Sequence, residues 1–506
     1  MTVMLSAKTR RWWGLGALAL ALLALGFDLT ILNVALPTLS VELHAGTSQL
    51  QWIVDAYALV FAALLLPAGL LGDRFGRKRL LLLGLGLFGA ASLAGSLVDG
   101  AGGLIVARMG MGIGAGMVMP LSMSMLPAIF PPEERTRAIA VWSGSMALGL
   151  PLGPLLGGVL LQHFWWGSIF LVNVPMVVVG MVAVAALLPE SRDPSTPKLD
   201  LAGSALSASG LALLVYGVIQ APENGWTDPV VVSSIGAGLA LLGALVAYES
   251  RIRQPLMDLR LFRSPSFLWG TVAGAVGTVV MSGALFVLPQ YLQAVRGADA
   301  FGTGLRMIPL MAGLLVAGIA VDRLAPRFGH KALILTGLLL LVPGLVLGAF
   351  SEPGSPYAFI ATWLAITGIG TGFALVPAMD LALAGLPDDQ AGRGSGLVQT
   401  IRQTSGALAV AALGSVSSAV YRDQLGPDAP HAARESVGQA VALAERTRDM
   451  ALLHDARDAY TSGMAAVLVG SAAVSLVMAV LVWRSLPRPA KDAADARESE
   501  HEHIAS

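Results

Sequence analysis

Long apolar runs, each bounded by glycine, proline or charged residues, recur along the whole chain. They form about fourteen segments, at 13–38, 49–71, 79–98, 102–126, 136–161, 167–188, 200–220, 229–249, 266–293, 303–325, 331–350, 356–385, 394–420 and 460–484. A helix that crosses a bilayer needs roughly 20 apolar residues. Only helices and closed barrels satisfy their backbone in lipid, and runs of this length are helices. The pattern predicts an all-α polytopic membrane protein.

Composition supports this class and excludes several others. Of the 506 residues, 55% are hydrophobic and 13% are charged, whereas soluble domains carry about 25% charged residues. The net charge is zero, so nothing favours nucleic-acid binding, and the absence of cysteine excludes disulfides and thiolate metal sites. The seven histidines are scattered. Because no nucleotide-binding loop, zinc motif or GxSxG turn occurs, we expect no cofactor and no metal.

Basic residues occur in alternate loops. They cluster at 74–79, 135–137, 251–263 and 323–331, whereas the loops 41–48, 97–102, 220–229 and 351–357 contain neither lysine nor arginine. The positive-inside rule then places both termini in the cytoplasm and segment 421–459 outside. In that segment Val437, Val441, Ala444 and Leu452 fall near helical spacing, which predicts an amphipathic helix on the outer face.

An internal repeat divides the chain. GLLGDRFGRK at 69–78 follows the second run, and GIAVDRLAPRFGHK at 318–331 follows the tenth. Matching signals in two halves are typical of duplicated transporter folds. We therefore predict an N-terminal bundle of six helices at 1–195, two inserted helices at 196–250, a C-terminal bundle of six at 251–488, and a disordered cytoplasmic tail at 489–506.

Several charged residues interrupt the apolar runs, and three of them stand out in the first half of the chain. Asp28 lies deep in the first run, Asp55 in the second and Arg108 in the fourth. A charge at the bilayer centre costs about 2.5–3.5 kcal/mol on insertion scales, so such residues are functional candidates. We hypothesise that Asp28 exchanges a proton for a substrate and that Asp55 lines the same cavity. The alternative for Asp28 is a structural acid paired with a neighbouring arginine or a helix terminus. The alternative for Asp55 is an interfacial acid exposed to water.

Other positions suggest packing or a polar cavity. GLPLGPLLGGVL at 149–160 combines prolines with glycines, which predicts a bent, closely packed helix with either a packing or a gating role. Methionines in the fourth run suit a promiscuous apolar surface, although plain packing is the commoner use. Candidates for lining the cavity are Asn33, Gln51, Tyr57, Met117, Gln290, Gln293, Gln399 and Gln403.

At these residues the chain resembles a known family. FDLTILNVALP at 27–37, GLLGDRFGRKR at 69–79, Arg108 with its neighbouring glycines, and GLPLGPLLGG at 149–158 are similar to motifs of the major facilitator superfamily, in its fourteen-helix drug:proton antiporter branch. The resemblance implies two six-helix bundles that alternate access, plus two inserted helices. It also implies proton-driven export of lipophilic cationic or neutral drugs by a transporter, not an enzyme.

The resemblance also assigns roles to residues. Asp28 would couple protons and bind cations, and Arg108 would assist the proton relay. The gating loop comprises Gly69, Asp73, Arg74, Gly76 and Arg77, with Asp322 and Arg323 as counterparts, and the antiporter helix is shaped by Gly149, Gly153, Pro154, Gly157 and Gly158. LVQTIRQTSG at 397–406 lacks the acids that some quaternary-ammonium exporters carry, which argues against dicationic substrates.

The expected setting follows from the same comparison. We expect a monomer in a bacterial inner membrane, whose partners are lipid, protons and small amphipathic substrates, without nucleic acid. A dedicated exporter of one endogenous metabolite or antibiotic stays open as an alternative, because its fold and coupling would be identical.

Overall fold

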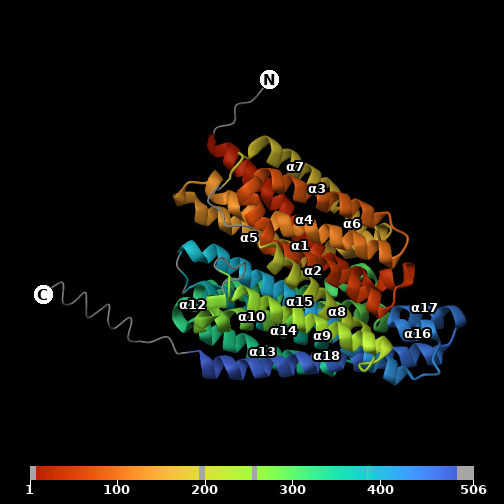
Figure 1. The fold of residues 1–506 in the computed structure, drawn as a ribbon. Helices are drawn as coiled ribbons and strands as arrows, with labels where there is room; N and C mark the ends of the chain where they lie inside the picture. Colours follow the sequence, from red (N-terminus) through yellow and green to blue (C-terminus); the bar gives the residue numbers. More distant parts are fainter. Residues whose placement is uncertain (1–6, 193–199, 253–258, 385, 387, 487–506) are drawn as a thin grey trace.

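Two helical bundles lie side by side in the computed structural model, which describes residues 7–192, 200–252, 259–384, 386 and 388–486 (Figure 1). Within these ranges every regular element is a helix. Thirteen of the described helical segments are long and apolar enough to cross a membrane. Helix α5, with 32 residues, spans the first bundle as well. The predicted all-α polytopic class is confirmed.

The first bundle comprises the helices before residue 190. They are α1 (Ala7–Glu42), α2 (Thr47–Phe75), α3 (Arg77–Ser96), α4 (Ala101–Ile129), α5 (Pro132–His163), α6 (Ser168–Leu171) and α7 (Asn173–Leu187). Helix α1 packs on α5 and α7, α2 packs on α4, and α3 packs on α4 and α7. The short helix α6 continues into α7, so the two together form the sixth span.

The second bundle repeats this arrangement. Its elements are the 3-10 helix η1 (Leu259–Arg263), α10 (Pro265–Gln290), the π-helix η2 (Tyr291–Val295), α11 (Ala300–Arg306), α12 (Ile308–Phe328), α13 (His330–Ala349), α14 (Tyr357–Leu383), α15 (Asp388–Leu425) and α18 (Met450–Ser485). Helix α10 packs on α15 and α18, α12 packs on α14, and α13 packs on α14 and α18. These are the same pairings as in the first bundle, as the sequence repeat predicts.

Two further helices lie between the bundles in the sequence. Helix α8 (Leu201–Asn224) packs against α9 (Pro229–Glu249), and α8 also packs against both α2 and α15. The Ser48 hydroxyl donates to the Gln220 side chain at 3.0 Å, and Arg422 pairs with Glu223 at 3.1 Å. The inserted pair therefore bridges the two bundles. The exact limits predicted for the three parts stay a prediction, and the 489–506 tail lies outside the described residues.

The two ends of the molecule carry different elements. The described chain starts at Ala7 and finishes at Leu486 on one side, which we call the terminal end (Figure 1). The short helices α16 (His431–Glu435) and α17 (Val437–Thr447) lie on the opposite side, which we call the hairpin end. Val437 and Ala444 lie on the buried face of α17, which confirms the predicted amphipathic helix. Leu452 instead belongs to α18.

The observed helix bounds differ most from the predicted apolar runs where a helix extends beyond its run. Helix α18 begins at Met450, ten residues before the predicted apolar run, because Asp449 caps its N-terminus by accepting from the Leu452 amide at 3.0 Å. The run at 303–325 is divided between α11 and α12 around Met307. Apolar periodicity marks the part of a helix that needs lipid or core, whereas capping residues decide where it starts.

Candidate functional site

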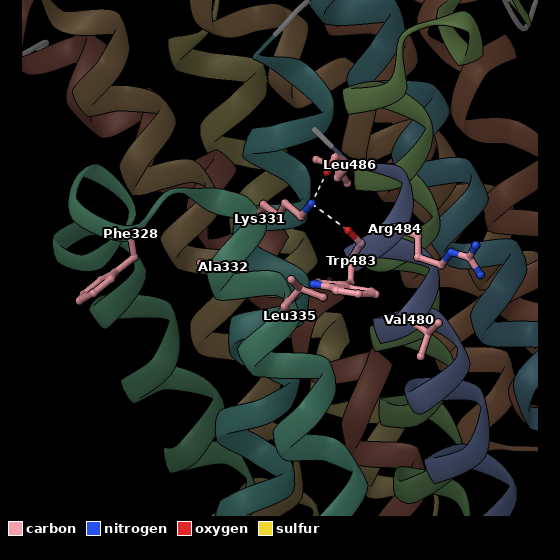
Figure 2. A pocket seen from close by; sticks show the side chains of 8 residues that line it. All are labelled: Phe328, Lys331, Ala332, Leu335, Val480, Trp483, Arg484 and Leu486. Carbon is pink, nitrogen blue, oxygen red and sulfur yellow. Dashed lines mark hydrogen bonds between the residues drawn. The ribbon is translucent and has the colours of Figure 1, made fainter. Parts of the chain in front are cut away.

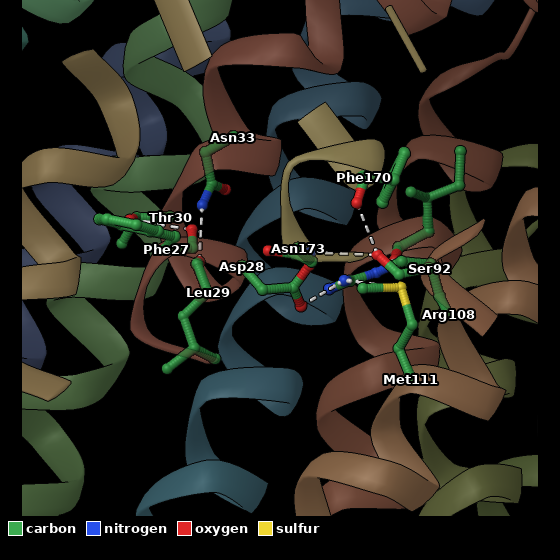
Figure 3. Close-up of polar contacts among 11 residues, drawn as sticks. Phe27, Asp28, Leu29, Thr30, Asn33, Ser92, Arg108, Met111, Phe170 and Asn173 are labelled. Atoms are coloured by element: carbon green, nitrogen blue, oxygen red, sulfur yellow. Dashed lines mark hydrogen bonds and ion pairs between the residues drawn. The ribbon is translucent and has the colours of Figure 1, made fainter. Parts of the chain in front are cut away.

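A buried ion pair lies inside the first bundle. The Arg108 Nη1 of α4 lies 2.6 Å from the Asp28 Oδ2 of α1, and the two side chains are 2% and 0% exposed (Figure 3). An isolated buried charge is very costly, and pairing with hydrogen bonds offsets that cost. The structure therefore brings together two of the three charged residues singled out in the sequence. Pairing with an arginine was the structural alternative for Asp28.

Further contacts hold the Arg108 guanidinium in place. Its Nε donates to the Ile53 carbonyl at 3.1 Å, and its Cζ lies 4.3 Å from the centre of the Tyr57 ring. The Asp28 carboxylate is less fully bonded, because its Oδ1 is buried without a hydrogen-bond partner among the described residues. One carboxyl oxygen of the pair is therefore buried and unbonded among the described residues.

Polar side chains lie beside this pair. The Asn173 amide donates to the Ser92 hydroxyl at 3.1 Å, and that hydroxyl donates to the Phe170 carbonyl at 2.8 Å (Figure 3). All these groups come from α3 and the α6–α7 span. Ser92 and Asn173 were not among the candidates predicted from the sequence. The only signal for them was a polar residue within an apolar run.

Asp55 occupies a separate position on α2. Its side chain is fully buried, and neither carboxyl oxygen has a hydrogen-bond partner among the described residues. Gln51, one helical turn earlier, donates to the Val410 and Ala411 carbonyls of α15 at 3.0 and 2.9 Å. Residues four apart share a helix face. Asp55 therefore lies on the side of α2 that faces the second bundle, and no recorded contact joins it to Asp28.

The glycines of the antiporter motif allow close helix contacts. A Cβ at Gly149 would lie 2.7 Å from the Gly26 backbone, and one at Gly157 would lie 2.8 Å from Ile31. A Cβ at Gly153 would collide with the Thr30 hydroxyl. These positions fix α5 against α1, the helix that carries Asp28. Gly158 instead contacts the second bundle, where a Cβ would meet Ala300 and Phe301 of α11 at 2.7 Å. Pro154 lies between Gly153 and Gly157 in the sequence, and its carbonyl contacts Gly304 of α11.

The gating loop forms a compact polar junction at the terminal end. Arg77 pairs with Asp73 at 2.7 Å and also donates to the Ser124 carbonyl and the Ser191 hydroxyl. Gly76 has φ 113°, in the region that favours glycine. Gly69 lies against Pro120, while Arg74 is exposed.

The repeated loop in the second half is built differently. Asp322 and Arg323 are both exposed, and neither forms an ion pair within the described part of the chain. The repeat therefore preserves the residue types without the bonded arrangement of Asp73 and Arg77.

Hydrogen bonds between the bundles lie toward the hairpin end. Gln293 of η2 donates to the Val34 carbonyl at 2.8 Å, and the Ser40 and Ser436 hydroxyls are 2.6 Å apart. Together with the Gln51 bonds, these contacts close the space between the bundles at that end.

Among the other cavity candidates, Asn33 and Gln290 bond to carbonyls of their own helices, at 3.2 and 3.0 Å, and Tyr57 and Met117 are buried.

A groove also opens at the terminal end of the second bundle. Its lining comes from the ends of α12, α13 and α18: Phe328, Lys331, Ala332, Leu335, Val480, Trp483, Arg484 and Leu486 (Figure 2). The Lys331 ammonium donates to the Trp483 carbonyl at 3.0 Å and to the Leu486 carbonyl. None of the predicted site residues lines this groove. Among the described residues, no three histidine or acidic side chains gather in a way that would hold a metal ion.

Comparisons with known proteins agree with this arrangement. Residues 18–410 match the profile of the Major Facilitator Superfamily. The "Multidrug efflux pump LfrA" of Mycolicibacterium smegmatis is 32% identical over 484 residues, covering 94% of this chain and 96% of that protein. The "Methyl viologen resistance protein SmvA" of Salmonella typhimurium is 34% identical, covering 95% and 99%.

Further similarities concern an antibiotic exporter and a solved fold. The "Tetracenomycin C resistance and export protein" of Streptomyces glaucescens is 32% identical, covering 80% of this chain and 76% of that protein. A crystal structure of a bacterial homolog to the human lysosomal transporter Spinster, in its inward-facing and unoccupied conformation, superposes with a TM-score of 0.67 at 18% identity, covering 96% of this chain and 100% of that one.

Proposed function

Because the chain belongs to the major facilitator superfamily, we propose that it is a proton-coupled antiporter that exports lipophilic cationic or neutral compounds by alternating access. It is a multi-pass membrane transporter, not an enzyme, and relatives that match almost its whole length include a multidrug efflux pump and a methyl viologen resistance protein. The observation that carries the coupling mechanism is the Asp28–Arg108 pair in the interior of the first bundle.

The pair suits a proton-driven exchange. A proton on Asp28 would cancel the carboxylate charge and leave Arg108 held by the Ile53 carbonyl and the Tyr57 ring. Loss of that proton restores the pair. Because Asp28 keeps one unbonded oxygen, a substrate cation would compete with the proton for the same carboxylate. That competition is the elementary requirement of an antiporter, since each ligand must displace the other.

Asp55 is the candidate for a second proton. Its carboxyl lies at the contact of α2 with the second bundle, without a bonding partner in the described chain. A carboxylate charge there has nothing to replace its lost hydration. Closure of the bundles at the hairpin end would therefore favour Asp55 with a proton bound, and opening to water would release it.

The same contacts give a direction to the cycle. By the positive-inside rule the terminal end faces the cytoplasm and the hairpin end faces outward. Export would then require the bonds of Gln51, Gln293 and Ser40 across the bundles to break on the outer side. The Asp73–Arg77 junction and the α1–α5 glycine contact would hold the first bundle rigid while it rocks. We place the transporter in a bacterial inner membrane as a monomer, with the proton gradient as its energy source.

Stoichiometry decides which part of the gradient drives export. A charge that crosses the membrane is worth about 2.3 kcal/mol per 100 mV. One proton exchanged for one monovalent cation moves no net charge, so only the pH gradient would act. Exchange of two protons for one cation, with Asp55 as the second proton site, would move net charge. The membrane potential would then drive export together with the pH gradient. Current in substrate-loaded proteoliposomes measures this, and strictly electroneutral exchange would exclude the two-proton version.

Ethidium efflux from energised cells that lack their own pumps tests the proposal. We compare the intact chain, Asp28→Asn, and Asp423→Asn as a matched control, because Asp423 is an exposed acid at the hairpin end of α15. Efflux that collapses with a protonophore and in Asp28→Asn, but not in the control, supports proton coupling at Asp28. Full efflux by an equally expressed Asp28→Asn would refute that role and direct attention to Asp55.

A dedicated exporter of one metabolite is the second candidate. Several relatives are named for resistance to a single antibiotic, including tetracenomycin C and puromycin. A panel of unrelated lipophilic compounds separates the two functions. Transport of several favours the broad pump, and transport of one compound alone favours the dedicated exporter.

A further inference from the structure

A second arginine lies at membrane depth, in the second bundle, without a counter-charge. Arg402 is the ninth residue of the α15 segment that begins at Gly394, about 12 Å along the helix at 1.5 Å per residue. Its Nε donates to the Thr278 hydroxyl of α10 at 3.3 Å. No acidic group within the described chain pairs with it, whereas Arg108 pairs with Asp28.

Most of the donors of Arg402 are unused. A guanidinium has five N–H donors and no acceptor. Only its Nε bonds to a described residue, and its terminal nitrogens are not sealed from solvent. The side chain is half-buried, so these donors are not enclosed by the packing around α15. The Thr278 hydroxyl uses its own proton on the Gly274 carbonyl at 3.0 Å and thus serves as a fixed acceptor that orients the guanidinium.

Two glutamines extend this set of donors. The Gln403 amide nitrogen is buried without a partner in the described part of the protein, and Gln399 makes no recorded side-chain bond. At roughly 100° per residue, Gln399 and Gln403 fall within about 100° of Arg402 on the helix surface. We call Gln399, Arg402 and Gln403 the α15 donor cluster.

The neighbouring helices show which way the cluster faces. Arg402 and Gly406 lie against α10, since a Cβ at Gly406 would be 3.1 Å from the Ser282 hydroxyl. Ala407 and Ala411 pack with Leu59 of α2. The two glutamines lie between these directions around α15. Because α2 belongs to the first bundle and α10 to the second, the cluster opens toward the space between the bundles, where alternating access would expose a substrate.

We propose that the α15 donor cluster binds the ionised oxygen group of an amphipathic substrate, a carboxylate, phenolate or enolate. The cluster has positive charge, a planar array of N–H donors and amide groups without partners, and this combination matches such an acceptor. A lipophilic cation gains nothing there, because Arg402 repels it. This inference rests on the proposed export function and narrows its substrates toward zwitterionic amphiphiles, which are neutral overall and would place their acid group at α15.

Binding to the purified full-length protein in nanodiscs of zwitterionic lipid tests the inference apart from transport. The probes are dansylglycine, which carries a carboxylate, and dansylglycinamide, which is matched but neutral. Saturable dansyl fluorescence gives each Kd. We expect the intact protein to bind dansylglycine at least tenfold more tightly. Arg402→Gln should remove this preference and leave the affinity for dansylglycinamide within about twofold, which also shows that the variant is folded.

Two further variants sharpen the result. Arg402→Lys keeps the charge and loses the planar fork, so the preference should fall three- to tenfold without vanishing; this variant decides the question if Arg402→Gln does not fold. Arg422→Gln is the matched control on the same helix, where Arg422 pairs with Glu223 at the hairpin end, and should change nothing. Equal affinity of the intact protein for both probes, or a preference unchanged in both Arg402 variants, overturns the inference.

The two proposals fail separately. Arg402-dependent binding of dansylglycine in a protein that exports nothing from cells sustains the acid-binding site and refutes the export function. Proton-driven ethidium efflux by a protein with no preference between the probes sustains the export function and refutes the acid-binding site.

Discussion

Alanine at Gly149 would force apart the two helices that position Asp28. Its Cβ would lie 2.7 Å from both the carbonyl carbon and the Cα of Gly26, and 2.9 Å from the Phe27 nitrogen. An ordinary van der Waals contact begins at 3.4 Å, so α1 and α5 must separate by about 0.7 Å. These neighbours are backbone atoms, which cannot rotate away as a side chain can. The separation therefore displaces α1 as a whole.

The expected cost follows from overpacking. Inserting one methyl group into a packed contact usually costs about 1–3 kcal/mol. With roughly 2 °C per kcal/mol for chains above 150 residues, the unfolding midpoint should fall by about 2–6 °C. Gly26 is two residues from Asp28, so the shift also strains the 2.6 Å contact of Asp28 with Arg108. Efflux at equal expression should fall at least threefold.

Gly144→Ala is the matched control, because Gly144 lies in α5 and has no atom within 4 Å of its Cβ position. Alanine is favoured over glycine in a helix by about 0.5–1 kcal/mol, so this variant should be unchanged or slightly more stable. Thermal unfolding of the purified variants and ethidium efflux are the measurements. A Gly149→Ala protein that matches Gly144→Ala in both would refute the close α1–α5 contact as a requirement.

A second substitution tests whether one contact is responsible. A Cβ at Gly26 would meet the Met146 carbonyl at 2.6 Å, across the same contact. Once one alanine has separated the helices, the other costs less, so the double variant should lose less stability than the sum of the singles. Strict additivity would show that the two glycines act at independent places.

Three other outcomes follow from the charges and the backbone. Arg108→Gln strands the buried Asp28 carboxylate and should cost about 3–5 kcal/mol in thermal unfolding; the double variant with Asp28→Asn should recover part of it, and no recovery would contradict the pair. Gly76→Ala must adopt φ 113° and should lose about 1–2 kcal/mol, whereas an unchanged unfolding midpoint would mean that the turn relaxes. Arg422→Gln should lose at most about 1 kcal/mol, because its partner Glu223 is 34% exposed, and a larger loss would mean that this bridge to α8 holds the bundles together.

Much of the fold could be predicted from local pattern. The apolar runs predicted the helices because a bilayer leaves few ways to satisfy a backbone. The repeated loops at 69–78 and 318–331 predicted two bundles with matching helix pairs. The N-terminal start of α18 could not be read from apolar spacing, because it depends on a cap by Asp449 in water.

The candidate site was predictable as residues but not as partners. Asp28, Asp55 and Arg108 are conspicuous because charge is rare in apolar runs. Which acid meets Arg108 depends on the packing of α1 against α4, about 80 residues apart in sequence. Asp28 and Asp55 lie at similar depth in their own helices, and that they line one cavity stays a prediction. The sequence gives the depth of a residue along its helix. It does not give the rotation of the helix about its axis, which decides the neighbour that the side chain faces.

The rotation of each helix also explains why Arg108 and Arg402 have different partners. Arg108 and Arg402 both interrupt apolar helices, and nothing in the local sequence separates them. In the first bundle α1 presents a carboxylate to Arg108, so the pair is neutral and its charge is satisfied internally. In the second bundle, as far as the described residues go, α10 presents a hydroxyl and no carboxylate to Arg402. Since an unpaired charge at that depth is costly, it persists only if water or a ligand in the space between the bundles solvates it. Under the two proposals made above, the first bundle would carry the charge that responds to protons and the second bundle the charge that binds a ligand.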